Sequence, residues 1–526
     1  MYIQPNSTIK LYKNVPLDTT YEHTLWFDSI TTQNNYFHNN SAILLQTFDG
    51  QTYQRVVNGE MTLGVNAESI YTCNYLAFRN TSFGTKWFYA FVTSVEYVSN
   101  TASKLTFEID VMQTYLFDVT LKECFVEREH SKTDNIGDNI IAENLDFGDY
   151  LQQGDSVKIF GNESVEVLQN VIVVATSVEY TNSEWKPVQG TLISNVYQGC
   201  KFYYFQPTIT SPDGGVNAFL NDVTQNAKED SILSIFMCPR WLYDGVTNGN
   251  EYNATKSIGD LRGSNISGYT PKNNKLFTYP YNLLYATTGN SSTNFKFEYF
   301  IDPSNITFKL AYQMSTTPSA MIVAKDYYTE RIKRADLDYY GDIDNTLILD
   351  GFPICSYTID SFRAWLAQNQ YNLTSSIIGL GANTGLNALD GGVSGTGVLN
   401  SGLSTVTSLA NATLLPPSSR GNASSNNLLF SDNMSDIFVC RKAIHGQYAK
   451  KIDNFFTKYG YATMELKVPN RNVRKQWTYC KTNGCVVIGN APADDVRRIC
   501  EIYDKGITFW KNASNVGNYE LDNSPV

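Results

Sequence analysis

The residue types that most often carry acid–base or metal chemistry are sparse in this sequence and lie far apart. Only four histidines occur among the 526 residues. They are His23, His38, His130 and His445. None stands at metal-ligand spacing from another histidine or cysteine, and the pair Cys480 and Cys485 lacks a second pair of ligands. We therefore expect no metal site and no cofactor.

Two carboxylates at alternate positions, Glu108 and Asp110, lie on one face of a strand predicted over 104–112. Glycosidase carboxylates normally come from different strands across a cleft, so we favour a solvated or subunit-facing sheet face. Glu129 and His130 follow an arginine and could form an acid–base element. We favour a structural ion pair there, and we expect no catalytic residue and no enzyme.

The recognised phosphate and nucleophile motifs are absent. The sequence contains no G-x-S-x-G, no Walker A and no dinucleotide fingerprint. The basic run 467–475, followed by Trp477 and Tyr479, could bind nucleic acid. However, a net charge of −11 and a pI near 5.0 argue against a protein that grips phosphates. We favour an intersubunit salt-bridge face, while an acidic chain could still surround DNA by repelling it.

Composition indicates a large, strand-rich protein. With 526 residues the chain is long enough for two to four domains, and its 35 Tyr and 28 Phe favour strands. The nine cysteines are odd in number and scattered, which favours synthesis in a reducing compartment over a disulfide framework. The first residues lack a basic and then apolar pattern, so we expect no secretory signal.

Periodicity predicts short strands with a few helices. The expected strands are Trp87–Val98, Lys104–Met112, one within 165–180, Lys201–Phe205, Ile232–Met237, Asn294–Tyr299, Ile306–Gln313, Ala320–Asp326 and Ile507–Trp510. The expected helices lie within 215–229 and over Ile359–Gln370, Tyr448–Tyr459 and Ala493–Tyr503, and 243–274 reads as loop.

One long segment differs from the rest of the chain. Between Arg363 and Arg420 the only charged residue is Asp390. A turn at 390–392 divides the segment into arms 373–389 and 393–415, which as helices would be roughly 26 and 34 Å long, close to a bilayer's thickness. Ser, Thr and Asn recur in both arms, so neither is a continuous apolar span. A flexible linker and a segment that moves from protein into a membrane both remain open. The residues expected to act in the second case are Leu373, Ile377, Ile378, Leu380, Leu386, Leu389, Asp390, Gly391, Gly392, Val393, Val398, Leu399, Leu403, Val406, Leu409, Leu414 and Leu415.

Collinear blocks at both ends and in the middle carry a family resemblance. They are Gly84–Thr93, Phe107–Phe117, Val126–His130, Asn274–Tyr281, Pro416–Pro417, Phe455–Tyr461, Pro469–Lys475, Asp504–Trp510 and Gly517–Tyr519. With these blocks the chain resembles the tail knob, or distal tail tube, proteins of phi29-like short-tailed phages (podoviruses). Residues from about 131 to 270 match only loosely.

The resemblance implies a hexameric tube of β-domains at the tip of a virion tail, made in the host cytoplasm. It implies an apolar loop that plugs the lumen and later forms a pore in the host cytoplasmic membrane during genome ejection. Segment 372–415 matches that loop in position, although it is shorter and more polar. The implied partners are copies of the chain, the upstream tail tube, other tail proteins, the membrane and genomic DNA, which passes without sequence-specific binding.

We therefore expect a mainly β fold of barrel- or sandwich-like tube domains with an α+β insertion and an α+β C-terminal region. The expected parts are a first tube-wall part at 1–130, an outer knob insertion at 131–274, a second wall part at 275–358, the helix and apolar loop at 359–420, and the C-terminal region at 421–526. One alternative is a virion-associated all-β hydrolase of cell-wall glycans. Another is a secreted pore-forming toxin, which the expected absence of a secretory signal disfavours.

Overall fold

The computed structural model divides the chain into two compact units, each made from separated stretches of sequence. Unit 1 comprises Met1–Gly148, Gly268–Leu276 and His445–Val526, and unit 2 comprises Asp149–Ser267 and Phe277–Ile444. The residues that the structure describes are 6–51, 59–81, 84–161, 170–180, 185, 187–189, 192–193, 196–197, 199–205, 215–225, 231–243, 252–288, 291–316, 319–327, 347–349, 352, 357–358, 419–420 and 436–526. The five-part division expected from the sequence stays a prediction.

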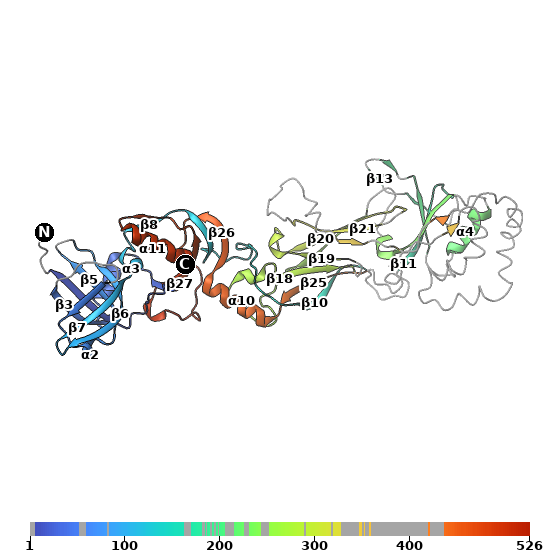
Figure 1. Cartoon of the computed structure of the whole chain (residues 1–526). Coiled ribbons are helices and arrows are strands. Elements are labelled where there is room, and N and C mark those ends of the chain that lie inside the picture. Colours follow the sequence, from blue (N-terminus) through green and yellow to red (C-terminus); the bar gives the residue numbers. More distant parts are fainter. Residues whose placement is uncertain are drawn as a thin grey trace. The chain divides into compact units, whose positions relative to one another are not determined.

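Unit 1 contains a six-stranded antiparallel sheet of order β3-β1-β5-β6-β7-β4, drawn in blue in Figure 1. Its strands are β1 (Ser7–Lys13), β3 (Leu44–Gln51), β4 (Gly59–Leu63), β5 (Cys73–Asn80), β6 (Phe88–Ser99) and β7 (Ala102–Ile109). Along β7 buried and half-exposed residues alternate, as the period-two pattern predicted. The expected hairpin of β6 and β7 is therefore confirmed.

A second sheet of unit 1 combines the two ends of the chain in the order β2-β29-β27-β9-β26. Its strands are β2 (His23–Leu25), β9 (Cys124–Glu129), β26 (Tyr461–Lys467), β27 (Trp477–Asn483) and β29 (Ile507–Trp510), and β8 (Val119–Leu121) pairs separately with β28 (Val487–Gly489). The helices of the unit are α1 (Ile30–His38), α2 (Ala67–Ile70), α3 (Val111–Thr114), α10 (Gly446–Tyr459) and α11 (Ala493–Lys505), with the 3₁₀ turns η2 (Asn274–Phe277, which crosses into unit 2) and η5 (Ala513–Asn515).

Helices α10 and α11 confirm the two C-terminal helices expected from amphipathic spacing. Helix α11 packs on β27. Its Ile499 belongs to one hydrophobic core with Trp477 of β27 and with Tyr75 of the six-stranded sheet. Helix α10 ends at Tyr459 and is capped by Gly460, whose φ of 67° is left-handed. A Cβ at Gly460 would overlap the Glu129 carbonyl oxygen, so the approach of α10 to β9 requires glycine.

The described residues of unit 2 form three four-stranded sheets. The first has the order β10-β25-β18-β19, the second β12-β15-β11-β16 and the third β17-β20-β21-β22. The strands are β10 (Tyr150–Phe160), β11 (Asn170–Thr176), β12 (Val188–Gln189), β15 (Lys201–Phe205), β16 (Ile232–Pro239), β17 (Tyr252–Gly259), β18 (Asn282–Thr287), β19 (Ser292–Phe295), β20 (Ile306–Gln313), β21 (Ser319–Ala324), β22 (Leu347–Leu349) and β25 (Ile437–Ile444). The described part of unit 2 also contains short elements: β13 (Leu192–Ile193) with β14 (Val196–Tyr197), β23 (Tyr357–Thr358) with β24 (Ser419–Arg420), α4 (Gly215–Gln225), α5 (Arg240–Tyr243) and η3 (Phe297–Tyr299).

The expected α+β element of unit 2 is confirmed: α4 buries Phe219 and Leu220 in one core with β11, β15 and β16. Three local predictions were wrong. Region 243–274 is not all loop, because β17 lies in it and pairs along its length with β20. The strand expected over 294–299 ends at Phe295 and gives way to a 3₁₀ turn. The strand expected over 104–112 ends at Ile109, where α3 begins after Asp110.

Candidate functional site

The predicted membrane-active residues, from Leu373 to Leu415, and the helix expected over 359–370 lie outside the described residues. Their flanks are described: Tyr357 pairs with Arg420, and Thr358 with Ser419, between β23 and β24. Among the described residues, no helix is both long and apolar enough to cross a membrane. The role of the segment therefore stays a prediction.

Asp110 is a buried capping residue, which corrects the expectation of a solvated or subunit-facing face. Its Oδ1 accepts hydrogen bonds from the backbone amides of Met112 (3.0 Å) and Gln113 (3.1 Å), and its Oδ2 accepts one from the Tyr75 hydroxyl (2.8 Å). The side chain is 1% exposed, and burial raises the pKa of Asp110 to about 6. Glu108 instead forms an ion pair with Arg498 of α11. The two carboxylates therefore do not converge on one site.

His130 is held in one neutral tautomer. Its Nδ1 accepts a hydrogen bond from the Tyr479 amide (2.8 Å), and its Nε2 lies 3.2 Å from the Thr457 carbonyl oxygen. An amide can only donate and a carbonyl can only accept, so Nε2 must carry the proton. Burial, reinforced by the Arg474 charge, lowers the pKa of His130 to about 3. Such a ring joins two strands and a helix and has no free nitrogen for proton transfer.

Glu129 is fully buried and bound by its surroundings, as expected for a structural carboxylate. Its oxygens accept from the backbone amide (2.7 Å) and side-chain amide (2.6 Å) of Asn470, and one oxygen pairs with Lys467 at 2.6 Å. Lys475 pairs with Asp522 at 3.2 Å. These two lysines of the basic run are thus paired within the chain, and the intersubunit face proposed for the run stays a prediction.

A second buried ion cluster surrounds Glu143. This carboxylate pairs with Lys275 (2.5 Å) and with Arg128, and Glu143 and Lys275 are almost completely buried. Burial lowers the pKa of Lys275, while Glu143 acts in the opposite direction. The cluster joins the N-terminal stretch of unit 1 to its short central stretch. Because each of these charged groups has a partner of opposite charge within unit 1, we interpret the cluster as structural.

Asp453 is the hydrogen-bond centre of unit 1 that sequence analysis missed. It is fully buried on α10 and accepts from the Tyr269 hydroxyl (2.7 Å), the Lys272 amide (2.8 Å) and the Asn273 backbone (3.0 Å) and side-chain (2.8 Å) amides. It therefore holds segment 268–276 against the helix. The available signal was its position beside Ile452 on the apolar face of α10, where an uncompensated charge is costly.

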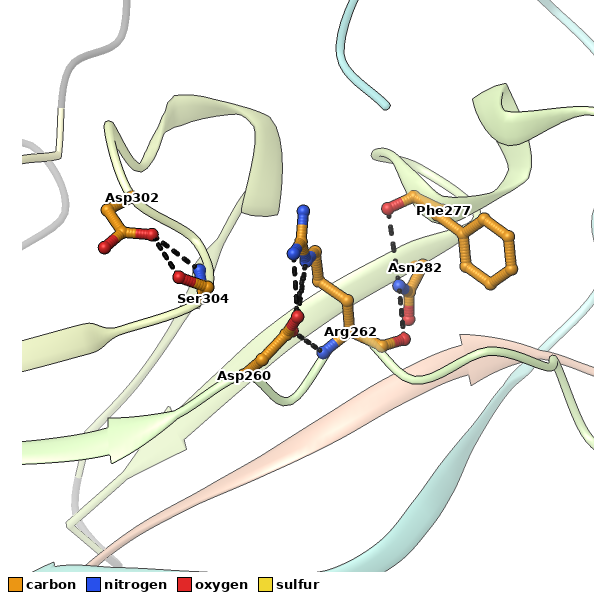
Figure 2. A network of polar contacts seen from close by, with 6 residues as sticks. All are labelled: Asp260, Arg262, Phe277, Asn282, Asp302 and Ser304. Atoms are coloured by element: carbon orange, nitrogen blue, oxygen red, sulfur yellow. Dashed lines mark hydrogen bonds and ion pairs between the residues drawn. The ribbon is translucent and has the colours of Figure 1, made fainter. Parts of the chain in front are cut away.

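Unit 2 has its own polar centre around Asn282 (Figure 2). The Asn282 side-chain amide donates to the carbonyl oxygens of Arg262 and Phe277, both at 3.3 Å, and its Oδ1 accepts from Arg441 Nε at 2.8 Å. Arg262 pairs with Asp260, which lowers the pKa of that carboxyl, and burial lowers the pKa of Arg441 to about 10. These contacts fix the 260–265 turn beside β18 and β25.

The described cysteines are all free thiols. Cys124, Cys485 and Cys500 are near neighbours, and burial raises the pKa of each thiol, which disfavours the thiolate needed for nucleophilic attack. In the part of the chain that the structure describes, no group of three or more His, Cys, Asp or Glu side chains is placed to hold a metal ion.

Comparison with known proteins identifies the architecture. A sequence model of the C-terminal domain of tail knob protein gp9 of Bacillus phage phi29 matches residues 246–524, more than half of the chain. The chain belongs to the phi29 tail knob protein family. A model of the N-terminus of caudoviral major tail proteins also matches residues 5–120. The protein is therefore a structural component of the phage tail in the virion.

The full-length relatives agree with this assignment to the tail knob family. The chain is 23% identical to tail knob protein gp9 of Bacillus phage phi29 and 25% identical to that of Bacillus phage B103, covering 98% of each partner in both cases. The tail knob protein gp12 of bacteriophage C1 shares the fold, with a TM-score of 0.56, 14% identity and coverage of 99% of this chain and 100% of that one. The resemblance and the mainly β fold class are thereby confirmed.

Proposed function

We propose that this tail knob protein forms, in six copies, a distal tube through which DNA leaves the virion. We further propose that residues 373–415 plug the lumen before infection and enter the host membrane on ejection. The observation that carries this proposal is the single charge between Arg363 and Arg420, in a chain where 17% of all residues are charged. Disordered linkers are usually rich in charge and poor in aliphatic residues, so this composition favours a segment with an apolar destination.

The described flanks support a loop that leaves and returns at one place. Backbone pairing joins Thr358 to Ser419, so the intervening residues can change their surroundings without pulling β23 and β24 apart. An excursion anchored in this way suits a plug that must be released while the tube wall stays intact.

The polar residues of the segment favour an assembled pore over independent helices. Ser, Thr and Asn side chains in lipid need partners, which neighbouring copies or a water-filled lumen would supply. Asp390 at mid-depth in a bilayer would cost roughly 2.5–3.5 kcal/mol on insertion scales, so we place it at an interface. The turn predicted from the sequence at 390–392, between the arms, is consistent with that location.

An overall charge of −11 suits a DNA conduit better than a DNA-binding surface. Lys467 and Lys475, within the run considered for nucleic-acid binding, pair with Glu129 and Asp522. Phosphate binding would require such cations to be released from their partners. We infer that DNA passes without sequence-specific contact.

The hydrolase alternative gains no support from the described residues. Asp110 caps a helix, Glu108 pairs with Arg498, and both His130 nitrogens are engaged. None of these groups forms the pair of facing carboxylates that glycan hydrolysis uses.

Three variants test the plug and the pore: Leu380→Lys, Leu403→Lys and deletion of 373–415, with Leu380→Ile and Leu403→Ile as matched controls. We expect the lysine variants and the deletion to form tubes in electron micrographs but to lose liposome leakage and DNA ejection. The isoleucine variants should behave as the parent does. Normal ejection by the deletion would reduce the segment to a linker, and compact monomers at high concentration would contradict the tube.

A further inference from the structure

Unit 1 brings together three cysteines that are separated in the sequence. The thiols of Cys485 and Cys500 hydrogen-bond to each other, and the thiol of Cys124 hydrogen-bonds to Cys485. Cys124 is only 4% exposed, whereas Cys485 and Cys500 are half-buried. The half-buried pair is therefore the part of the cluster that a small molecule in solution can reach.

Helix α11 fixes the position of this pair. Cys500 lies one helical turn before Asp504 on α11, so the two side chains share one face of the helix. Asp504 Oδ1 accepts hydrogen bonds from the Cys485 backbone amide (3.0 Å) and from the Thr482 hydroxyl (2.7 Å). These bonds hold the turn between β27 and β28 against that face. They keep Cys485 beside Cys500 independently of any bond between the two sulfur atoms.

The two thiols are not equivalent. Burial raises the pKa of both, so thiolate is scarce at neutral pH. Hydrogen bonds from the Cys485 thiol and from the Val487 backbone favour the thiolate of Cys500, whereas the bond between the sulfurs disfavours the thiolate of Cys485. Because the thiolate is the nucleophile, Cys500 is the thiol that should attack first.

We propose that Cys485 and Cys500 form a disulfide once the protein meets an oxidising medium, and that this bond locks helix α11 to the turn between β27 and β28. The oxidant is a low-molecular-weight disulfide such as oxidised glutathione. The Cys500 thiolate attacks one sulfur of the oxidant, which forms a mixed disulfide and releases one small thiolate. The Cys485 thiolate then attacks the Cys500 sulfur, which forms the protein disulfide and releases the second small thiolate. Two protein thiols are oxidised, one small disulfide is reduced, and the two protons end on the released thiols.

Such a lock suits a component of the virion tail. Disulfides form and persist on virions outside the cell, whereas the cytosol keeps thiols reduced. Helix α11 contributes Ile499 to the core that contains the six-stranded sheet, so a bond that holds α11 also holds this core. A disulfide stabilises a fold mainly by restricting the unfolded chain. The proposal is independent of the plug and the pore.

The test uses the full chain, first reduced and then incubated with oxidised glutathione between about pH 7 and about pH 9. The remaining thiols are alkylated in denaturant, and the peptides are mapped by mass spectrometry. We expect one cross-link, between the peptides that contain Cys485 and Cys500, which dithiothreitol removes. It should form faster at the higher pH, because more thiolate is present. No cross-link at any pH, or a cross-link to Cys124 instead, would overturn the proposal.

Variants assign the role of each thiol. Cys485→Ser should stop at a stable mixed disulfide on Cys500, whereas Cys500→Ser should leave Cys485 largely unmodified. The opposite pattern would refute Cys500 as the attacking thiol. Cys200→Ser, which removes a half-buried thiol of unit 2, is the matched control and should leave the cross-link unchanged.

The effect of the lock is measured on the parent protein, so it does not depend on the folding of a variant. In the oxidised parent the amides of α11 should exchange with solvent about tenfold more slowly than in the reduced parent, or slower still. Unit 1 should unfold about 5–10 °C higher in the oxidised form. A cross-link that leaves the exchange of α11 and the unfolding temperature unchanged would refute the lock.

Discussion

Removing the Asp453 carboxylate should release segment 268–276 from helix α10. In Asp453→Ala the backbone amides of Lys272 and Asn273 lose their acceptors. Asn273 keeps a side-chain contact with Thr457 (2.8 Å), and Tyr269 is half-buried and can turn to water, so these two groups lose less. A buried donor left without a partner costs about 1–3 kcal/mol. Asn273 is buried, whereas Lys272 is exposed and its amide can turn to water, so we predict a loss of about 1–3 kcal/mol from this segment.

Hydrogen exchange followed by mass spectrometry measures this effect locally, without assuming that both units unfold together. We expect the amides of 268–276 to exchange much faster in Asp453→Ala, with smaller changes in the six-stranded sheet. In Asp453→Asn the exchange rate of these amides should lie between those of the parent and the alanine variant. The asparagine oxygen can still accept hydrogen bonds on one side, while its NH₂ group faces donors on the other. Asn454→Ala, at the exposed next position on α10, is the matched control and should change stability by less than about 0.5 kcal/mol. Unchanged protection of 268–276 in Asp453→Ala would refute the reasoning.

Three further predictions follow from the same unit. Gly460→Ala should destabilise unit 1 by about 1–3 kcal/mol, because the φ of Gly460 is left-handed and the new Cβ would meet β9. Thermal unfolding measures this loss. Gly84→Ala is the control, because the φ of Gly84 is also positive but the space around it is open. Burial raises the pKa of Asp110 to about 6 from a value of 3.8, so its contribution to stability is greatest at low pH and is lost as pH rises from about 4 to about 6. Asp110→Asn lacks this titration and should gain up to about 3 kcal/mol relative to the parent over that interval in urea unfolding. Glu108→Gln should leave any hydrolysis of cell-wall glycans unchanged, because Glu108 forms an ion pair with Arg498 and is not expected to act in catalysis.

Each of these predictions has an outcome that contradicts it. Equal melting temperatures for the Gly460 and Gly84 variants would show that the close approach to β9 is unimportant. Parallel pH profiles of the parent and Asp110→Asn would mean that this carboxyl titrates normally in the folded protein. Loss of a measurable hydrolase activity in an assembled Glu108→Gln protein would revive the enzyme interpretation.

The sequence by itself determined the features that depend on local periodicity. The alternation along β7 and the amphipathic spacing of α10 and α11 were visible because a strand or helix with one buried face must repeat its apolar residues at a fixed interval. The family was also recognisable, since collinear blocks of residue types survive at an identity of 23–25%. The low charge of 364–419 is likewise a property of composition alone.

Only the tertiary structure decided how separated segments satisfy one another. Strand β17 has few aliphatic residues and no strong signal of its own, but β20 supplies backbone partners along its length. The strand containing Glu108 stops because Asp110 turns inward to bind two amides and a hydroxyl. Arg474 belongs to a basic run that would be expected at the surface, yet it is only 3% exposed in the folded chain. Burial and hydrogen bonding of a polar side chain depend on residues hundreds of positions away, and no local pattern encodes them.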